Sequence, residues 1–349
     1  MYNIHIGTRQ SRQTRRPLFA NRRFIDTIRL YSCKGGHTYE NTGKKNLRVA
    51  VVQASPVMFD KDATLDKVVS QIAEAGTHGA ELIVFPESLV PCYPYGLTFG
   101  FNVGSRSEDG RKDWKIYYDN SVVVPSADTD RIGKAAKEAG AYVSIGITER
   151  DSTNYSLYCT NLVFSPDGKL AAKHRKIKPT GAERYIWADS HDPDTYFPIT
   201  DTPWGPSAPD PAGKITCPWP ASPCISRESP CILLLIPTTI PNGRTRSGTS
   251  PSKATATSST PTSTLRRAMY PDSLLAKDEI ARLKDETCIG GSCIIDPYGH
   301  CVIEPVWNQE AIIYADLDMD AVPMSHMEFD GVGHYARPDI LELTVRDGK

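Results

Sequence analysis

A glutamate stands directly after an apolar segment in the first third of the sequence. Residues 79–88 read Gly-Ala-Glu-Leu-Ile-Val-Phe-Pro-Glu-Ser, which places Glu87 just beyond the end of a predicted buried strand. A carboxylate at such a strand end, in partly apolar surroundings, is well placed to act as a general base with a raised pKa. Taken alone, Glu87 is more simply interpreted as a surface acid in a loop, so its assignment depends on the other motifs.

The second motif that suggests chemistry is a basic segment. Residues 173–187 read Lys-His-Arg-Lys-Ile-Lys-Pro-Thr-Gly-Ala-Glu-Arg-Tyr-Ile-Trp, with cations at 173, 175, 176 and 178. Such a run is usually a solvated face. A cation that leaves a strand beside a carboxylate can, however, stabilise negative charge that develops during a reaction.

An alternation of helical and strand patterns supplies the elements that would hold these motifs. The residues at 47–54 and 80–85 predict buried strands, and apolar spacing over 62–76 predicts a helix between them. A helix over 130–139 and a strand over 141–147 repeat this alternation. The other predicted elements are hairpins at 161–174 and 290–305, a helix at 274–284 and a strand at 312–318. This order indicates a layered α/β domain.

The composition is that of a soluble globular protein. The 349 residues include 40 basic and 41 acidic side chains, and 40% are hydrophobic. No stretch approaches 18 consecutive apolar residues, so no membrane span is expected. The nine cysteines lack paired spacing, which argues against a disulfide framework or a zinc site. His326 and His334 lie near Asp330 with loose spacing, which favours a surface loop over a metal site.

Residues 1–46 form a separate basic extension, with a net charge of +8 against −9 for the rest of the chain. Its weak apolar periodicity favours a disordered extension or an upstream stretch wrongly joined to the gene. Its arginines also fit a mitochondrial presequence. A nucleic-acid arm is disfavoured because no aromatic-interleaved basic fold follows. We expect a cytoplasmic protein, with a mitochondrial location as the alternative.

Residues 206–267 depart from the α/β pattern. They contain eleven of the 27 prolines, and their acids are Asp210 and Glu228 alone. Such a composition is typical of a disordered linker. A structureless segment of this length inside a compact domain is itself uncommon, so composition and position disagree.

Together the motifs resemble the nitrilase branch of the carbon–nitrogen hydrolase superfamily. The segment 47–56 is similar to its opening strand, and the Phe-Pro-Glu that ends at Glu87 is similar to its glutamate motif. The His-Arg-Lys that ends at Lys176, with the following Pro-Thr and Glu183, is similar to its lysine motif. Cys92 is a departure, because the family usually has glycine before Tyr-Pro. The resemblance covers residues 47–205 and 268–335.

The resemblance implies a four-layer α-β-β-α sandwich and a Glu-Lys-Cys triad that needs no metal or other cofactor. Glu87 would shuttle protons, Lys176 would stabilise charged intermediates, and Glu183 would be a supporting carboxylate. The implied substrate is a small-molecule nitrile, converted to a carboxylic acid and ammonia by a homo-oligomer. No nucleic-acid or membrane partner is expected. The hydrolase domain would span 47–335, with a C-terminal tail at 336–349.

The third member of the triad is missing from the chain as written. After Gly205 the family would continue through a strand to Cys-Trp-Glu, seven residues beyond that glycine. Position 212 is alanine instead. Cys217 and Cys224 lie among prolines and are not followed by Trp-Glu, so we expect them to be inert thiols.

A shift of reading frame would account for the loss. If the last nucleotide of each codon is read with the first two of the next, Ala-Gly-Lys-Ile-Thr-Cys-Pro-Trp at 212–219 can become Cys-Trp-Glu-Asn-Tyr-Met-Pro-Leu. Residues 236–243 and 253–259 likewise yield ordinary folded sequence. We infer two compensating frame slips, near 205–206 and near 265–268. The segment 206–267 is then not a linker.

Three hypotheses follow. The first is a nitrilase by descent whose written sequence lacks its nucleophile and is inactive. The second is a nitrile or cyanide hydratase that forms an amide, and the third is a non-catalytic nitrilase-like subunit. The sequence of the coding DNA distinguishes the third hypothesis from the others.

Overall fold

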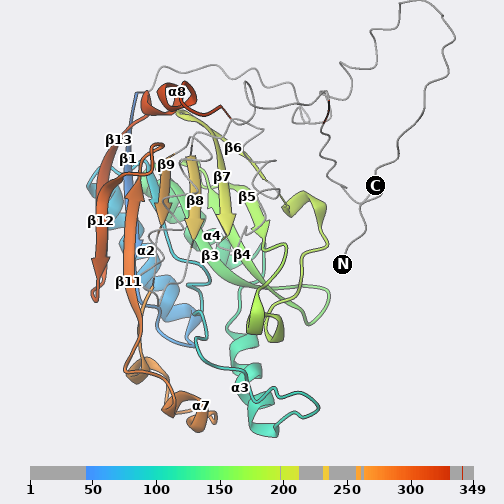
Figure 1. Cartoon of the computed structure of the whole chain (residues 1–349). Coiled ribbons are helices and arrows are strands. Elements are labelled where there is room, and N and C mark those ends of the chain that lie inside the picture. Colours follow the sequence, from blue (N-terminus) through green and yellow to red (C-terminus); the bar gives the residue numbers. More distant parts are fainter. Residues whose placement is uncertain are drawn as a thin grey trace, which may run out of the picture. The chain divides into compact units, whose positions relative to one another are not determined.

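The computed structural model describes residues 45–196, 198–211, 231–235, 257–260, 263–330 and 340. Its core consists of two β-sheets (Figure 1). The first has the order β13-β1-β2-β3-β4-β5. Its strands are β1 (Asn46–Gln53), β2 (Leu82–Val84), β3 (Tyr142–Arg150), β4 (Leu157–Phe164), β5 (Leu170–Arg175) and β13 (Ala311–Asp318).

The second sheet has the order β10-β11-β9-β8-β7-β6, with β12 paired to β11. Its strands are β6 (Thr200–Thr202), β7 (Gly205–Pro211), β8 (Cys231–Leu235), β9 (Thr257–Thr260), β10 (Thr264–Arg266), β11 (Glu286–Ile295) and β12 (Cys301–Trp307). Four of these strands, β7 to β10, fall almost entirely within 206–267. The described residues of this segment therefore belong to the second sheet.

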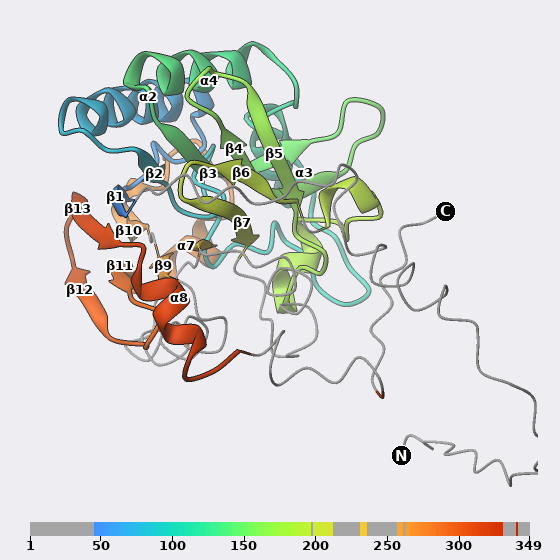
Figure 2. The same ribbon diagram turned by 90° about the horizontal axis from the view of Figure 1, so that it is seen from above.

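Two helices cover the outer face of the first sheet. They are α2 (Lys61–Thr77) and α4 (Ala127–Ala139), and Figure 2 shows both on the side of the sheet that faces away from the second sheet. Leu65 and Ile72 of α2 and Ile132 of α4 are fully buried in one apolar cluster with alternate residues of β1 and β3. The Asp60 carboxylate caps α2 by accepting from Ala63 N at 3.0 Å.

The opposite face of the first sheet packs on the second sheet. Successive side chains of a strand point to opposite faces, so Val49 and Val51 join an apolar cluster with Trp204 and Ile294 of the second sheet. Gln53 links the two layers at the end of β1. Its Oε1 accepts from the backbone N–H groups of Gly291 and Ser292, each at 2.9 Å.

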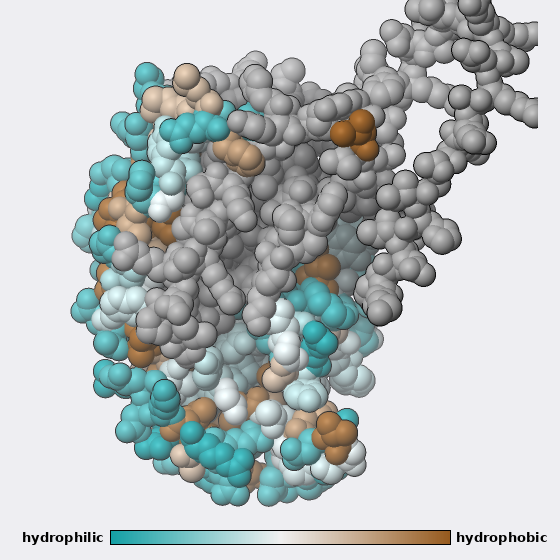
Figure 3. Space-filling model, viewed as in Figure 1, coloured by the Kyte–Doolittle hydropathy of each residue, from teal (hydrophilic) through white to brown (hydrophobic). Residues whose placement is uncertain are grey.

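A peripheral region joins helix α3 (Glu108–Asp119) to helix α7 (Lys277–Ala281). Buried Asp113 of α3 accepts from the backbone N–H groups of Leu275 and Ala276, and Glu279 of α7 accepts from Thr98 and Gly100. On the visible face of this region, hydrophobic residues are scattered among hydrophilic ones (Figure 3). Scattered exposure of this kind is ordinary for a folded protein surface.

The elements predicted from the sequence are present, but one helix is shorter than predicted and some elements were not predicted. The strands and helices at 47–85 and 130–147 and both hairpins occur within a few residues of their predicted ends. The helix predicted at 274–284 is shorter, since α7 covers only Lys277–Ala281. The patterns gave no indication of α3, of β6 or of α8 (Ala321–His326). Of the predicted extension at 1–46, residues 1–44 lie outside the described residues, as do all residues of the predicted tail at 336–349 except 340.

Candidate active site

The two sequence motifs meet at one edge of the first sheet. β1, β2 and β3 are parallel, and β5 has the same direction because two antiparallel pairings relate it to β3. Their carboxyl ends therefore lie at the same edge. Glu87 follows β2 and Lys176 follows β5, so residues 89 positions apart in sequence reach each other across the sheet.

The backbone turn at Glu87 is fixed by β3. The N–H of Gly146 donates to the carbonyl of Pro86 at 3.1 Å, and the N–H of Leu89 donates to the carbonyl of Gly146 at 2.9 Å. Ser88, between these contacts, has a φ of 46°, which is uncommon for a residue with a side chain. Strained backbone that is held by its surroundings is frequent at functional sites.

Lys176 lies between two carboxylates. Its Nζ is 2.9 Å from Oε1 of Glu87 and 2.9 Å from Oε2 of Glu183. The side chains of Lys176 and Glu87 are each only 2% exposed. A buried cation with two acidic partners is held in one position, because its desolvation cost is offset only while those charge-assisted bonds persist.

Glu183 is fixed by three further donors. Its carboxylate accepts from the backbone N–H of Thr180 at 2.6 Å, from the Thr180 hydroxyl at 3.1 Å and from the Tyr93 hydroxyl at 2.9 Å. Glu183 belongs to the short 3₁₀ helix η1 (Gly181–Tyr185). The Pro-Thr that precedes this helix in the sequence therefore supplies part of the acid's binding shell.

The two carboxyl groups of the cluster differ in pKa. Burial raises the pKa of Glu87, with a further increase from the charge of Glu183, and the charge of Lys176 opposes both. Burial would raise the pKa of Glu183 too, but the charge of Lys176 and the donors at Thr180 and Tyr93 lower it below its ordinary value. The two acids hold the pKa of Lys176 above its usual range despite burial. The ionised form of Glu183 is thus favoured, whereas Glu87 is suited to exchange a proton.

Comparison with known proteins identifies this architecture. The family model "Carbon-nitrogen hydrolase" matches residues 48–217. An aliphatic nitrilase of Sinorhizobium fredii is 38% identical over 85% of this chain and 95% of its own length. The bifunctional nitrilase/nitrile hydratase NIT4B of Nicotiana tabacum is 35% identical over 88% of each chain. The chain belongs to the nitrilase family of carbon–nitrogen hydrolases.

Solved structures show the same fold at low sequence identity. Saccharomyces cerevisiae Nit3, a member of branch 10 of the nitrilase superfamily, has a TM-score of 0.62 at 20% identity and covers 82% of this chain and 94% of its own. An amidase from Nesterenkonia sp. has a TM-score of 0.59 at 14% identity, with coverage of 81% and 95%. The predicted α-β-β-α sandwich of the carbon–nitrogen hydrolase type is therefore confirmed.

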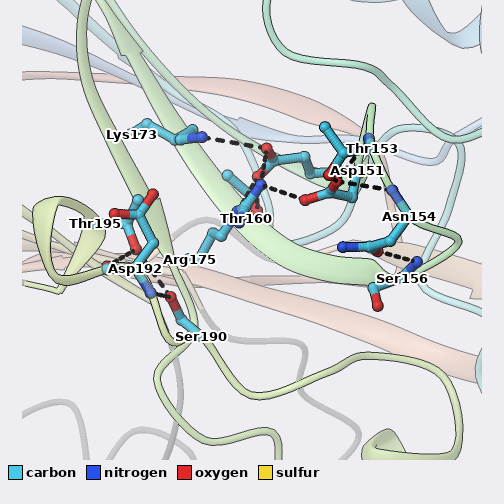
Figure 4. Close-up of polar contacts among 11 residues, drawn as sticks. Asp151, Thr153, Asn154, Ser156, Thr160, Lys173, Arg175, Ser190, Asp192 and Thr195 are labelled. Atoms are coloured by element: carbon cyan, nitrogen blue, oxygen red, sulfur yellow. Dashed lines mark hydrogen bonds and ion pairs between the residues drawn. The ribbon is translucent and has the colours of Figure 1, made fainter. Parts of the chain in front are cut away.

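The other cations of the basic segment serve the nitrilase fold elsewhere. Lys173, Arg175 and Thr160 converge on one carboxylate (Figure 4), that of Glu149, at 3.3, 2.6 and 2.8 Å. Since strand side chains alternate, these groups lie on the face of the sheet opposite to Lys176. Lys178 pairs with Asp189 at the surface. Lys176 is thus the cation of this segment that reaches Glu87.

His174 is a second buried member of the basic segment. Its Nδ1 lies 2.7 Å from the backbone carbonyl of Thr195. Thr195 itself contacts Ser190, which also binds the backbone N–H of Asp192 (Figure 4). Burial lowers the pKa of His174 to about 4. His174 is therefore neutral near pH 7 and anchors the loop instead of adding charge to the site.

Three residues near Glu87 were not found from the sequence. Gly146 supports the Glu87 turn, Tyr93 binds Glu183, and the Cys159 thiol donates to Oε1 of Glu87 at 3.2 Å. Tyr93 carried a usable signal, since it belongs to the Tyr-Pro that follows the glutamate motif. Cys159 and Gly146 are interior strand residues that carry no such local signal.

β7, after which the sequence analysis expected the nucleophile, lies between β8 and the edge strand β6 of the second sheet. β7 packs against β4 and β5, and Figure 1 shows β7 and β5 running in the same direction. The carboxyl end of β7, at Pro211, therefore lies at the end of the sandwich that carries Lys176. Position 212, Cys217 and Cys224 lie outside the described residues.

No cluster of three or more potential metal-ligating side chains occurs in the described part of the chain. His326 Nδ1 lies 3.6 Å from a carboxylate oxygen of Asp330, and His334 is outside the described residues. Among the helices that the structure describes, none is long and apolar enough to cross a bilayer.

Proposed function

We propose that this site belongs to a nitrilase-type hydrolase that converts a small organic nitrile to a carboxylic acid and ammonia. Glu87 transfers protons, Lys176 stabilises negative charge, and Glu183 is a supporting carboxylate that positions Lys176. The observation that carries the proposal is the asymmetry of the Glu87 carboxylate. Oε1 is occupied by Lys176 Nζ, whereas buried Oε2 has no hydrogen-bond partner among the described residues and is free to take a proton.

The reaction requires a cysteine thiol beside this carboxylate. The thiol gives its proton to Oε2 of Glu87 as sulfur attacks the nitrile carbon, and the nitrogen takes up that proton to give a thioimidate. Water then adds with Glu87 as base, ammonia leaves, and a thioester remains. A second water molecule releases the acid and regenerates the thiol. In total, one nitrile and two waters give one acid and one ammonia.

Lys176 is suited to this sequence because each addition step places negative charge on the reacting group. Its ammonium is already fixed by Glu87 and Glu183, so little reorganisation accompanies that change. The cluster of two acids and one lysine carries a net negative charge. Burial outweighs the charge of Lys176 and raises the pKa of Glu87, so this base is easier to protonate than a carboxylate in water, as a proton shuttle requires.

We place the missing thiol at position 212, which directly follows β7. The described direction of β7 toward the Lys176 end of the sandwich supports this place, as does the Cys-Trp-Glu that the alternative frame provides there. In a mutant of the Nesterenkonia amidase, a fluoroacetamide fragment is covalently added at the active-site cysteine. We define the frame-restored chain as this protein with residues 206–267 encoded in the alternative frame. The chain as written would be inactive.

Formation of the amide is the second candidate reaction. It is favoured by relatives named bifunctional nitrilase/nitrile hydratase, such as NIT4B of Nicotiana tabacum. The two reactions share the thioimidate and differ in the group that leaves after water adds. Loss of ammonia leads to the acid, and loss of the thiol leads to the amide. Quantifying acid and amide from one nitrile distinguishes them.

The test of the proposal begins with the coding DNA across codons 200–270. An intact single frame that encodes Cys-Trp-Glu supports an active enzyme and excludes a non-catalytic subunit. Ammonia release by the frame-restored chain then tests the chemistry. We also propose a cytoplasmic homo-oligomer, which size measurement of the purified protein and localisation of a fluorescent fusion would check.

A further inference from the structure

A chain of hydrogen bonds reaches Glu87 from strand β4. The Ser88 hydroxyl donates to Sγ of Cys159 at 3.4 Å, and the Cys159 thiol donates to Oε1 of Glu87 at 3.2 Å. All three side chains are buried. None of them belongs to the segment 206–267, so this contact does not depend on how that segment is read.

This chain holds one side of the carboxylate. Oε1 accepts from both the Cys159 thiol and Lys176 Nζ, the latter at 2.9 Å. Oε2 has no partner among the described residues. One donor lies on β4 and the other directly follows β5. Together they fix the rotation of the carboxylate, because turning it would exchange the bound oxygen for the free one.

We propose that Cys159 is a positioning residue for the general base. Its thiol holds Oε1 so that Oε2 is left to exchange the proton of the nucleophile and of water. The inference rests on the proposed function of Glu87. It adds a residue that acts through Glu87 and does not touch the substrate.

The surroundings of Cys159 suit a donor and not a nucleophile. Burial, and then the charge of Glu87, raise the pKa of the Cys159 thiol well above its ordinary value. The sulfur therefore keeps its proton, and its attack on a substrate would require a thiolate. As a donor, the thiol stabilises the ionised form of Glu87, which burial alone disfavours.

The competing interpretation is that Cys159 only fills space in its apolar cluster beside Leu157 and Trp187. The two interpretations differ in what Cys159→Ser and Cys159→Ala would do. Serine keeps a donor of similar size, whereas alanine removes the donor. Cys92 provides the matched control, because it is equally buried, lies in the loop after Glu87 and also titrates above its ordinary pKa through burial.

The kinetic test uses the full-length frame-restored chain. In Cys159→Ala we expect kcat/KM to fall about tenfold. We also expect the acidic limb of the pH profile of kcat/KM to move to higher pH by about one pH unit, since a hydrogen bond to the ionised base is lost. Cys159→Ser should keep the parent limb. Cys92→Ala should leave the limb in place. An unmoved limb in Cys159→Ala would overturn the inference, as would an equal shift in the serine variant and the alanine variant.

A spectroscopic test requires no turnover. The infrared S–H band of Cys159, identified by its loss in Cys159→Ala, should shift when Glu87→Gln replaces the charged acceptor. A band that stays in place means that the thiol does not bind the carboxylate, which contradicts the inference. Absence of turnover in the frame-restored parent contradicts the proposed function and with it the role of Cys159. Normal turnover with an unmoved limb contradicts the role of Cys159 alone.

Discussion

Gly146 of β3 lies directly against the backbone of Glu87. A Cβ atom at Gly146 would come within 2.5 Å of the Glu87 Cα and of the Pro86 carbonyl oxygen. Real Cβ atoms do not approach backbone this closely, so any larger residue must displace the turn. The backbone of Glu87 can therefore take this position only because Gly146, 59 residues later in the sequence, has no side chain.

The first prediction concerns Gly146→Ala in the frame-restored chain. We expect kcat to fall by about 100-fold, because misplacement of a catalytic group by about 1 Å is sufficient for such a loss. Gly140→Ala is the control for backbone strain alone, since Gly140 has a φ of 63°, which disfavours any side chain, but has no atom within 4 Å of its absent Cβ. Equal turnover in the two variants would show that the close approach at Gly146 does not set the position of the base.

The second prediction concerns the base itself. Glu87→Gln should lower kcat by about 10²- to 10⁴-fold, the usual contribution of a general acid–base group. Burial raises the pKa of Glu87 in the folded state. The ionised side chain therefore lowers the free energy of unfolding as the pH rises from its ordinary pKa to the raised one. The variant should therefore be as stable as the parent, or more stable, at neutral pH in urea unfolding. Near-normal ammonia release would remove Glu87 from the reaction.

The third prediction concerns Lys176→Met. Removal of the cation leaves two buried carboxylates without their common partner, which should cost about 3–5 kcal/mol of stability near pH 7. Without the lysine, the pKa of each acid in the folded state rises, so each acid keeps its proton to a higher pH in the folded state than in the unfolded state. The free energy of unfolding of the variant should therefore fall as the pH rises. Urea unfolding of the parent and the variant across the neutral range measures this. The double variant Lys176→Met with Glu183→Gln should recover part of the loss, and a lack of recovery would contradict the pairing.

Whether a residue of this site could be predicted depends on how far apart in the sequence it and its contact partners lie. Glu87 and Lys176 carry local motifs, and strand ends at one edge bring them together, so their proximity followed from the pattern of elements. The choice of Lys176 among four cations came from the resemblance to the lysine motif, and the structure agrees with it, since Lys173 and Arg175 bind Glu149 on the opposite face. Cys159 and Gly146 contact Glu87 through tertiary packing, which no local pattern encodes.

The same limit explains the elements that were missed. Helix α3 has few core residues, and its buried Asp113 is satisfied by backbone donors at 275 and 276, more than 160 residues away. A polar residue with a distant partner gives no helical apolar pattern. Strands β7 and β9 were obscured for another reason, since β7 is written with three prolines and β9 consists only of Thr and Ser, so neither has the apolar pattern of a buried strand. β8, written Cys-Ile-Leu-Leu-Leu, keeps strand character.

The fourth prediction separates structural from catalytic cations. Arg175→Met should lower the free energy of unfolding by about 3–5 kcal/mol, because Glu149 is buried and loses its bidentate partner. Lys178→Met, at an exposed ion pair, should change it by less than about 1 kcal/mol. Denaturant unfolding compares the two variants. A loss in Lys178→Met as large as in Arg175→Met would contradict the assignment of Glu149 as the centre of this cluster.

The most direct test of the account is ammonia release from a panel of small aliphatic and aromatic nitriles by the chain as written and by the frame-restored chain. We expect the frame-restored chain to release ammonia, its alanine variant at position 212 to release none, and the chain as written to release none. The alanine variant and its parent should unfold at the same temperature, so that a loss of activity reflects the thiol. Ammonia release by the chain as written, or none by a folded frame-restored chain on any nitrile, would contradict the proposal that the site needs a cysteine at 212.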